Sequence, residues 1–174
     1  MRLFFSSLVI FCLSTALAYA QINQTYLFSG NLNNTSGANP LTPVDYTGQS
    51  SGNVFQNDII SNCGISKSIY HVVRDAGVQF NGGAGSDYNV GYSVTLYFRA
   101  PGYTGGYYRL LDVKNGVGDA GIYMLGSNLN FFPNGNVGAN LLANAASSYV
   151  MLTLTRNTVT KLVSVYINGV IATT

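Results

Sequence analysis

Carboxylates are few in this chain and are spread along it. There is no Glu, and the six Asp stand at positions 45, 58, 75, 87, 112 and 119. A retaining glycosidase needs two carboxyl groups about 5–5.5 Å apart, one as nucleophile and one as acid/base. Because no two of these Asp share one face of an expected strand, we expect that the protein is not an enzyme of this kind.

Histidine and cysteine chemistry is equally sparse. His71 is the only histidine, so a zinc site has too few ligands, and a Ser-His-Asp triad would lack the Gly-x-Ser-x-Gly motif. We expect His71 to be a hydrogen-bonded strand residue. Cys63 is the one cysteine beyond the N-terminal segment, which excludes an internal disulfide. The sequence leaves two readings of Cys63, a buried small hydrophobe or a free thiol.

One group of oxygen-bearing side chains could hold a metal ion. Asp112, Asn115 and Asp119 flank a turn over residues 114–118, which would bring the two Asp together if it forms a hairpin. Calcium takes about six to eight oxygen ligands from carboxylates, amides and carbonyls. These three residues are therefore a candidate calcium site. The alternative is a solvated hairpin in which Asp caps the turn, and the positive charge of Lys114 beside the site favours that alternative.

Tyrosine supplies the other candidate site. The chain has 13 Tyr and no Trp, and a Gly-rich segment over residues 102–108 carries Tyr103, Tyr107 and Tyr108. A tyrosine ring offers a flat apolar face and a hydroxyl, which suits stacking on a sugar. These three residues are the candidate ligand-binding set. Gly-Tyr loops also occur on β scaffolds that bind nothing, so that reading stays open.

The N-terminus predicts export. Arg2 is followed by an apolar stretch over residues 3–13, and the small residues of Ala18-Tyr19-Ala20 resemble a signal peptidase site. We expect residues 1–20 to be a signal peptide and the secreted protein to begin at Gln21. An uncleaved signal anchor is the alternative. The mature chain has no other apolar stretch of spanning length, and a net charge of +2 is too small to attract nucleic acid.

The elements that must position these residues are strands. Apolar and polar residues alternate over 91–99, 149–156 and 162–167, as successive side chains do on a pleated strand. Shorter strand candidates are 25–29, 68–73, 78–81, 107–113, 121–125 and 128–132. The one plausible helical turn covers 139–146.

Turn residues separate these strands. Asn-Gly pairs begin at positions 81, 115, 134 and 168, and Asn-Gly suits tight hairpins because both residues tolerate positive φ. Gly126-Ser127-Asn128 is a further hairpin candidate. Residues 31–56 are rich in Asn, Ser, Thr, Gly and Pro and predict long loops around one or two edge strands. Together these signals predict an all-β protein with two packed antiparallel sheets.

The order of motifs between Val90 and Gly169 resembles a known family. It runs through Arg109-Leu110-Leu111-Asp112 and closes with Tyr166-Ile167-Asn168-Gly169. This pattern resembles laminin-G-like domains of the concanavalin-A-like lectin/glucanase superfamily, especially bacterial secreted and surface-sorted members. The resemblance implies a jelly-roll sandwich over residues 21–174, a binding or adhesive role and, in many relatives, one calcium ion.

The chain departs from that family pattern at its end. Such domains continue with further strands, whereas this sequence stops at Thr174. We therefore expect a C-terminally truncated domain that lacks its last strands. Apolar side chains on one face of 163–167 or 150–154 should then be poorly covered, and the protein should associate or unfold easily.

These observations favour a secreted, non-catalytic binding or adhesion domain. The expected partner is a glycan or an extracellular or cell-surface protein. Two alternatives remain, a structural surface or matrix protein without a small ligand, and a degenerate relative of the glucanases.

Overall fold

The protein is described from a computed structural model. The structure describes residues 23–37, 39–45, 48, 52–60, 63–74, 76–81, 91–112, 114 and 116–173. The expected signal peptide, the expected new terminus at Gln21, and Asn115 of the candidate calcium site lie outside the described residues. Within these ranges the named elements are all β-strands, which confirms the all-β prediction. The described residues contain no helix that is long and apolar enough to cross a membrane.

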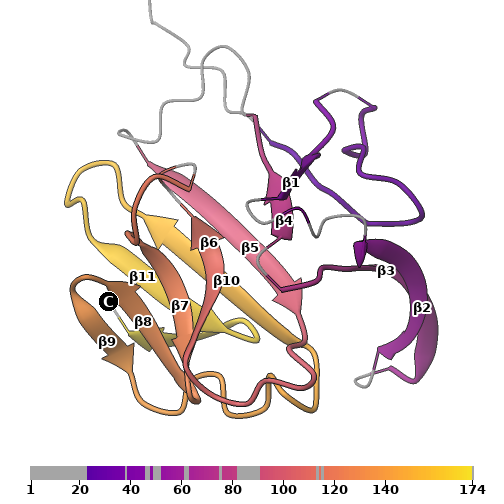
Figure 1. Cartoon of the computed structure of the whole chain (residues 1–174). Coiled ribbons are helices and arrows are strands. Elements are labelled where there is room, and N and C mark those ends of the chain that lie inside the picture. Colours follow the sequence, from indigo (N-terminus) through magenta and orange to yellow (C-terminus); the bar gives the residue numbers. More distant parts are fainter. Residues whose placement is uncertain are drawn as a thin grey trace, which may run out of the picture.

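The strands form four antiparallel sheets (Figure 1). The first eight strands are β1 Thr42–Asp45, β2 Val54–Ile60, β3 Ile65–His71, β4 Ala76–Gln79, β5 Tyr92–Phe98, β6 Tyr107–Asp112, β7 Gly121–Leu125 and β8 Asn128–Phe132. The rest are β9 Gly135–Gly138, β10 Val150–Arg156, β11 Val163–Ile167 and β12 Val170–Thr173. β1 pairs with β4 and β2 with β3, while the two larger sheets have the orders β12-β11-β10-β5 and β6-β7-β8-β9.

The two four-stranded sheets pack into a sandwich. The chain leaves the first sheet after β5, builds the whole second sheet from β6 to β9, and returns as β10 beside β5 (Figure 1). The common core contains Leu152 and Leu154 of β10 and Met124 and Leu129 of the second sheet, all at most 1% exposed. Two packed antiparallel sheets are therefore confirmed, while the jelly-roll topology stays a prediction.

Alternation along the strands explains this core. In β10 the side chains of Val150, Leu152 and Leu154 are buried and those between them are half-buried. β5 alternates in the same way between half-buried and exposed positions. Because successive side chains leave opposite faces of a strand, each sheet presents one apolar face to the other. These are the patterns from which the strands were predicted.

Other elements differ from the sequence predictions. Residues 25–29 do not form a strand, and only an isolated bridge joins Tyr26 to Asn34. β2 was not predicted, and its first three residues lie in the region 31–56 that was expected to form loops around edge strands. β9, which begins at Gly135 of the Asn134-Gly135 pair, was not predicted either. The residues of 139–146 form consecutive turns and no helix. This segment closes one end of the sandwich, where Leu142 and Ala145 are buried and Ala145 O accepts a hydrogen bond from Ala100 N.

The expected gap in the sandwich does not lie over β10 or β11. Leu152, Leu154 and Val165 are each at most 1% exposed, so the inner faces of these strands are covered where poor cover was predicted. The segment 139–148 and the β6–β9 sheet supply that cover. Exposed apolar side chains occur instead on β12, where Val170 is 69% and Ile171 is 57% exposed.

A polar cluster around Asp58 joins the hairpin β2–β3 to the sandwich. The Asp58 carboxylate of β2 accepts hydrogen bonds from Arg99 and, at 2.8 Å, from the Tyr149 hydroxyl. Burial raises the pKa of Tyr149 to about 12, and its bond to Asp58 acts in the same direction. Cys63 at the turn of this hairpin is exposed and free, which decides between its two readings in favour of the thiol.

Candidate functional site

Both candidate sites lie on or beside β6, and a β-bulge in that strand decides which of their side chains meet. Arg109 pairs with Tyr123 of β7, whereas Leu111 pairs with Ile122, so the register shifts at Leu110. In a regular strand, residues three apart point to opposite faces. The extra residue returns Asp112 to the face of Arg109. The two side chains form an ion pair with an Nη1–Oδ2 distance of 2.8 Å.

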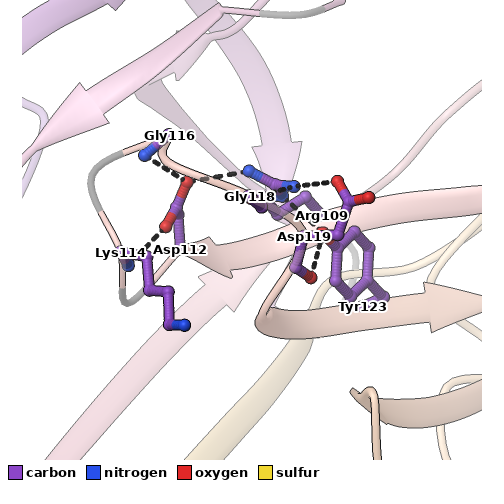
Figure 2. Close-up of polar contacts among 7 residues, drawn as sticks. All are labelled: Arg109, Asp112, Lys114, Gly116, Gly118, Asp119 and Tyr123. Carbon is purple, nitrogen blue, oxygen red and sulfur yellow. Dashed lines mark hydrogen bonds and ion pairs between the residues drawn. The ribbon is translucent and has the colours of Figure 1, made fainter.

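Arg109 stands between the two carboxylates of the predicted calcium site (Figure 2). Its Nη1 donates to Asp112, and its Nη2 donates to Asp119 Oδ1 at 3.2 Å. Its Nε donates to the Tyr123 hydroxyl at 2.7 Å, and the guanidinium carbon lies 5.2 Å from the centre of that ring. The Tyr123 hydroxyl in turn donates to the backbone oxygen of Asp119 at 2.9 Å. The guanidinium therefore fixes strand, loop and ring together.

Asp112 organises the loop that follows β6. Its Oδ1 accepts a hydrogen bond from Lys114 N at 2.6 Å, and its Oδ2 accepts one from Gly116 N at 2.8 Å. Burial raises the pKa of Asp112, but these two backbone N–H groups and the Arg109 guanidinium outweigh burial and leave the pKa below its ordinary value. The carboxylate is thus held ionised by contacts within its own loop, as the capping alternative predicted.

The Arg109 guanidinium occupies the position between the two carboxylates at which the sequence predicted a calcium ion. Among the described residues, no group of three or more His, Cys, Asp or Glu side chains could hold a metal ion. Arg109 supplies the positive charge between Asp112 and Asp119 that the prediction would assign to calcium. Asn115, the third predicted ligand, lies outside the described residues. Calcium binding stays a prediction, with a guanidinium as its competitor.

The three candidate tyrosines separate into different roles. The Tyr103 hydroxyl donates to Gly106 O and accepts from Gly126 N at 2.6 Å, so it ties its own loop to the β7–β8 turn. Tyr108 lies opposite Met124 of the core, forms an edge-to-face pair with Tyr103, and has a pKa raised by burial. Tyr103 packs against the core, whereas Tyr108 lies on the inner side of the sheet and is 40% exposed.

Tyr107 belongs to the outer face instead. Its side chain is 58% exposed and its ring lies edge-to-face with Tyr123 at 5.5 Å and with Phe132 at 6.1 Å. Tyr123 is only 6% exposed, and Phe132 is 38% exposed. We call Tyr107, Tyr123 and Phe132 the outer aromatic cluster. Its two accessible rings are oriented by the third, which is itself fixed by Arg109.

A row of polar side chains crosses the sheet beside this cluster. The pairing register aligns Arg109, Tyr123, Asn130 and Asn136, one from each strand from β6 to β9. Asn130 Nδ2 donates to Asn136 Oδ1 at 3.0 Å. Asn130 is 4% exposed and its Oδ1 has no hydrogen-bond partner. The outer face therefore joins aromatic rings to hydrogen-bonding groups, as sugar recognition requires.

Sequence reasoning missed most of this face. Arg109, Tyr123, Asn130 and Phe132 were not among the predicted site residues. Alternation over 121–125 and 128–132 places Tyr123, Asn130 and Phe132 on the face opposite Met124 and Leu129, so that signal was present. The contact of these residues with Tyr107 depends on strand pairing, which alternation alone does not give.

Comparisons with protein-family models, with curated proteins and with solved structures find no match for this chain.

Proposed function

We propose that this protein is a secreted, non-catalytic binding or adhesion domain whose ligand is a glycan. The observation that carries the proposal is the outer aromatic cluster, in which Tyr107 and Phe132 are exposed and held edge-to-face over the buried Tyr123. Sugar rings stack on such aromatic faces, and rings that are already ordered lose little entropy on binding. Tyr107 is the member of the cluster that the sequence had also selected.

The polar groups around the cluster support a glycan over a purely apolar ligand. The Asp119 side chain is 79% exposed, and it is tied to the cluster through Arg109 and Tyr123. A carboxylate accepts hydrogen bonds from sugar hydroxyls, and Asn136 adds an amide at the other end of the row. An aromatic ring flanked by such groups fits the apolar faces and polar edges of a sugar.

The test is a glycan array followed by titration calorimetry with the protein purified after expression of the full chain. Tyr107→Ala should weaken binding of the selected glycan by roughly tenfold, because it removes the most exposed ring. Tyr107→Phe keeps the ring and should retain most of the affinity. The matched control is Tyr97→Ala, since Tyr97 is 47% exposed but lies on β5 of the other sheet.

Secretion is tested separately. N-terminal sequencing of the exported protein should begin at Gln21, whereas a retained Met1 would favour the signal-anchor alternative.

A structural surface or matrix protein is the second candidate function. Strand β12 favours it, because among the described residues β12 is the end strand of its four-stranded sheet, and its Val170 and Ile171 are exposed. An unprotected apolar edge promotes strand-to-strand association. An empty glycan array together with concentration-dependent assembly would favour this candidate.

A further inference from the structure

The charges beside the outer aromatic cluster define which glycans it can take. Arg109 is the one guanidinium in contact with the cluster among the described residues, and it is shared by Asp112 and Asp119. One positive and two negative charges leave the trio with a net charge of −1. Lys114 donates its backbone N–H to Asp112, while its ammonium group extends away from Arg109 (Figure 2).

Four of the five N–H donors of Arg109 already have partners. Nε bonds to Tyr123, Nη1 to Asp112, and Nη2 to Asp119 and, at 3.4 Å, to Gly118 O. A guanidinium binds sulfate or carboxylate through free parallel donors, and this arrangement offers no such pair to a ligand. The exposed charge next to the rings is instead the carboxylate of Asp119, whose side chain is 79% exposed.

From this arrangement we infer that the outer face of β6–β9 selects uncharged glycans and excludes acidic ones. An uncharged sugar stacks on Tyr107 and Phe132 and donates a hydroxyl to the Asp119 carboxylate. A sulfated or uronic acid sugar meets the net negative charge of the trio at the same place and finds no free guanidinium to neutralise it. The inference rests on the proposed function and adds the ligand class.

The unpartnered Oδ1 of Asn130 is a second, independent observation at this face. Asn130 is only 4% exposed, and its Oδ1 is buried. The residue pairs with Tyr123 of β7 and precedes Phe132 by two positions on β8. A buried acceptor without a partner costs free energy until a donor reaches it. Hydroxyl-rich, uncharged sugars supply such donors, whereas an anionic group supplies another acceptor.

The experiment compares one oligosaccharide scaffold in neutral, sulfated and uronic acid forms, by calorimetry at about 0.05 and 1 M NaCl. The neutral form should bind at least about tenfold more tightly at low salt. This preference should shrink at high salt, because screening shortens the reach of the trio's charge. Asp119→Asn should weaken the neutral form by roughly tenfold and reduce discrimination against the acidic forms.

The outcomes separate the two proposals. If no form binds at either salt concentration, the proposed glycan function fails and the selectivity falls with it. If the acidic forms bind more tightly than the neutral form, the function stands and the inferred selectivity is overturned. If the neutral form is preferred but neither Tyr107→Ala nor Asp119→Asn changes its affinity, the glycan binds elsewhere and this face is excluded. The unaffected Tyr97→Ala control shows that a loss in the other variants is local.

Discussion

Asp112 and Asp119 both pair with the Arg109 guanidinium but differ in burial. Replacing each by Asn should therefore lower the free energy of unfolding by different amounts. The Asp112 side chain is 19% exposed and accepts from Lys114 N, Gly116 N and Arg109. Asn has one acceptor oxygen and would turn an NH₂ group toward one of these donors. An unsatisfied buried donor costs about 1–3 kcal/mol, and partial exposure places the Asp112→Asn loss at about 2 kcal/mol.

The Asp119→Asn variant is the matched control. Its side chain is 79% exposed and forms a single 3.2 Å ion pair, so we expect a loss of at most about 0.5 kcal/mol. The assay is urea unfolding followed by circular dichroism and tyrosine fluorescence, since the chain has no Trp. In thermal scans the Asp112→Asn loss should appear as about 4–8 °C and the Asp119→Asn loss as about 2 °C or less. Equal losses would refute the role given to Asp112.

The difference in unfolding free energy between the wild type and Asp112→Asn should depend on pH. The pKa of Asp112 is lowered in the folded state, so its contribution is fully present above the unfolded value of about 3.9 and is lost as pH falls through the folded pKa. The stability difference between the wild type and Asp112→Asn should be constant between pH 7 and 5. It should shrink below about pH 4. A difference that grows on acidification would contradict the assigned direction of the pKa.

Three further outcomes are expected. Tyr103→Phe should cost about 1 kcal/mol in urea unfolding, because its hydroxyl ties the 104–106 loop to the β7–β8 turn, and an unchanged midpoint would remove that role. Millimolar calcium or chelator should leave the melting temperature unchanged, because Arg109 already stands between the carboxylates, whereas a rise with calcium would restore the predicted site. Gly121→Ala should cost about 1–3 kcal/mol, because its Cβ would lie 2.8 Å from Leu111 O, while Gly77→Ala, whose nearest contact is an ordinary 3.5 Å, should cost less than about 1 kcal/mol.

Strands with a strict two-residue period were predictable because one face of each is buried. β5, β10 and β11 fall within predicted ranges, and β7 and β8 match them at both ends. The turn at Gly126-Ser127 between β7 and β8 was also predicted, from its turn-forming residues. β2 was missed because Gln56, Asn57 and Asp58 interrupt its apolar residues, and its hairpin is secured by the contacts of Asp58 with Arg99 and Tyr149. Those contacts join residues far apart in the sequence.

The bulge in β6 is the feature that sequence reasoning could not supply. Leu110 and Leu111 are both apolar and both pack against the core, so composition gives no sign that one of them is extra. Regular alternation would have sent Asp112 to the face opposite Arg109. Asp112 and Asp119 would then have appeared as a carboxylate pair without a counter-ion. The calcium prediction was made from the turn over residues 114–118, without knowledge of the contact with Arg109.

Alternation along β6 shows that the predicted tyrosines cannot all belong to one ligand site. Tyr107 and Tyr108 are adjacent on β6, and adjacent strand residues leave opposite faces, so they could not both line one sugar site. Strand pairing then decides which of them faces the core, since Tyr108 lies opposite the buried Met124 and Tyr107 approaches Tyr123 and Phe132. A ligand site on this sheet must therefore be built from β6, β7 and β8 together. That requirement selects Tyr107 from the predicted tyrosines and gives it partners from both neighbouring strands.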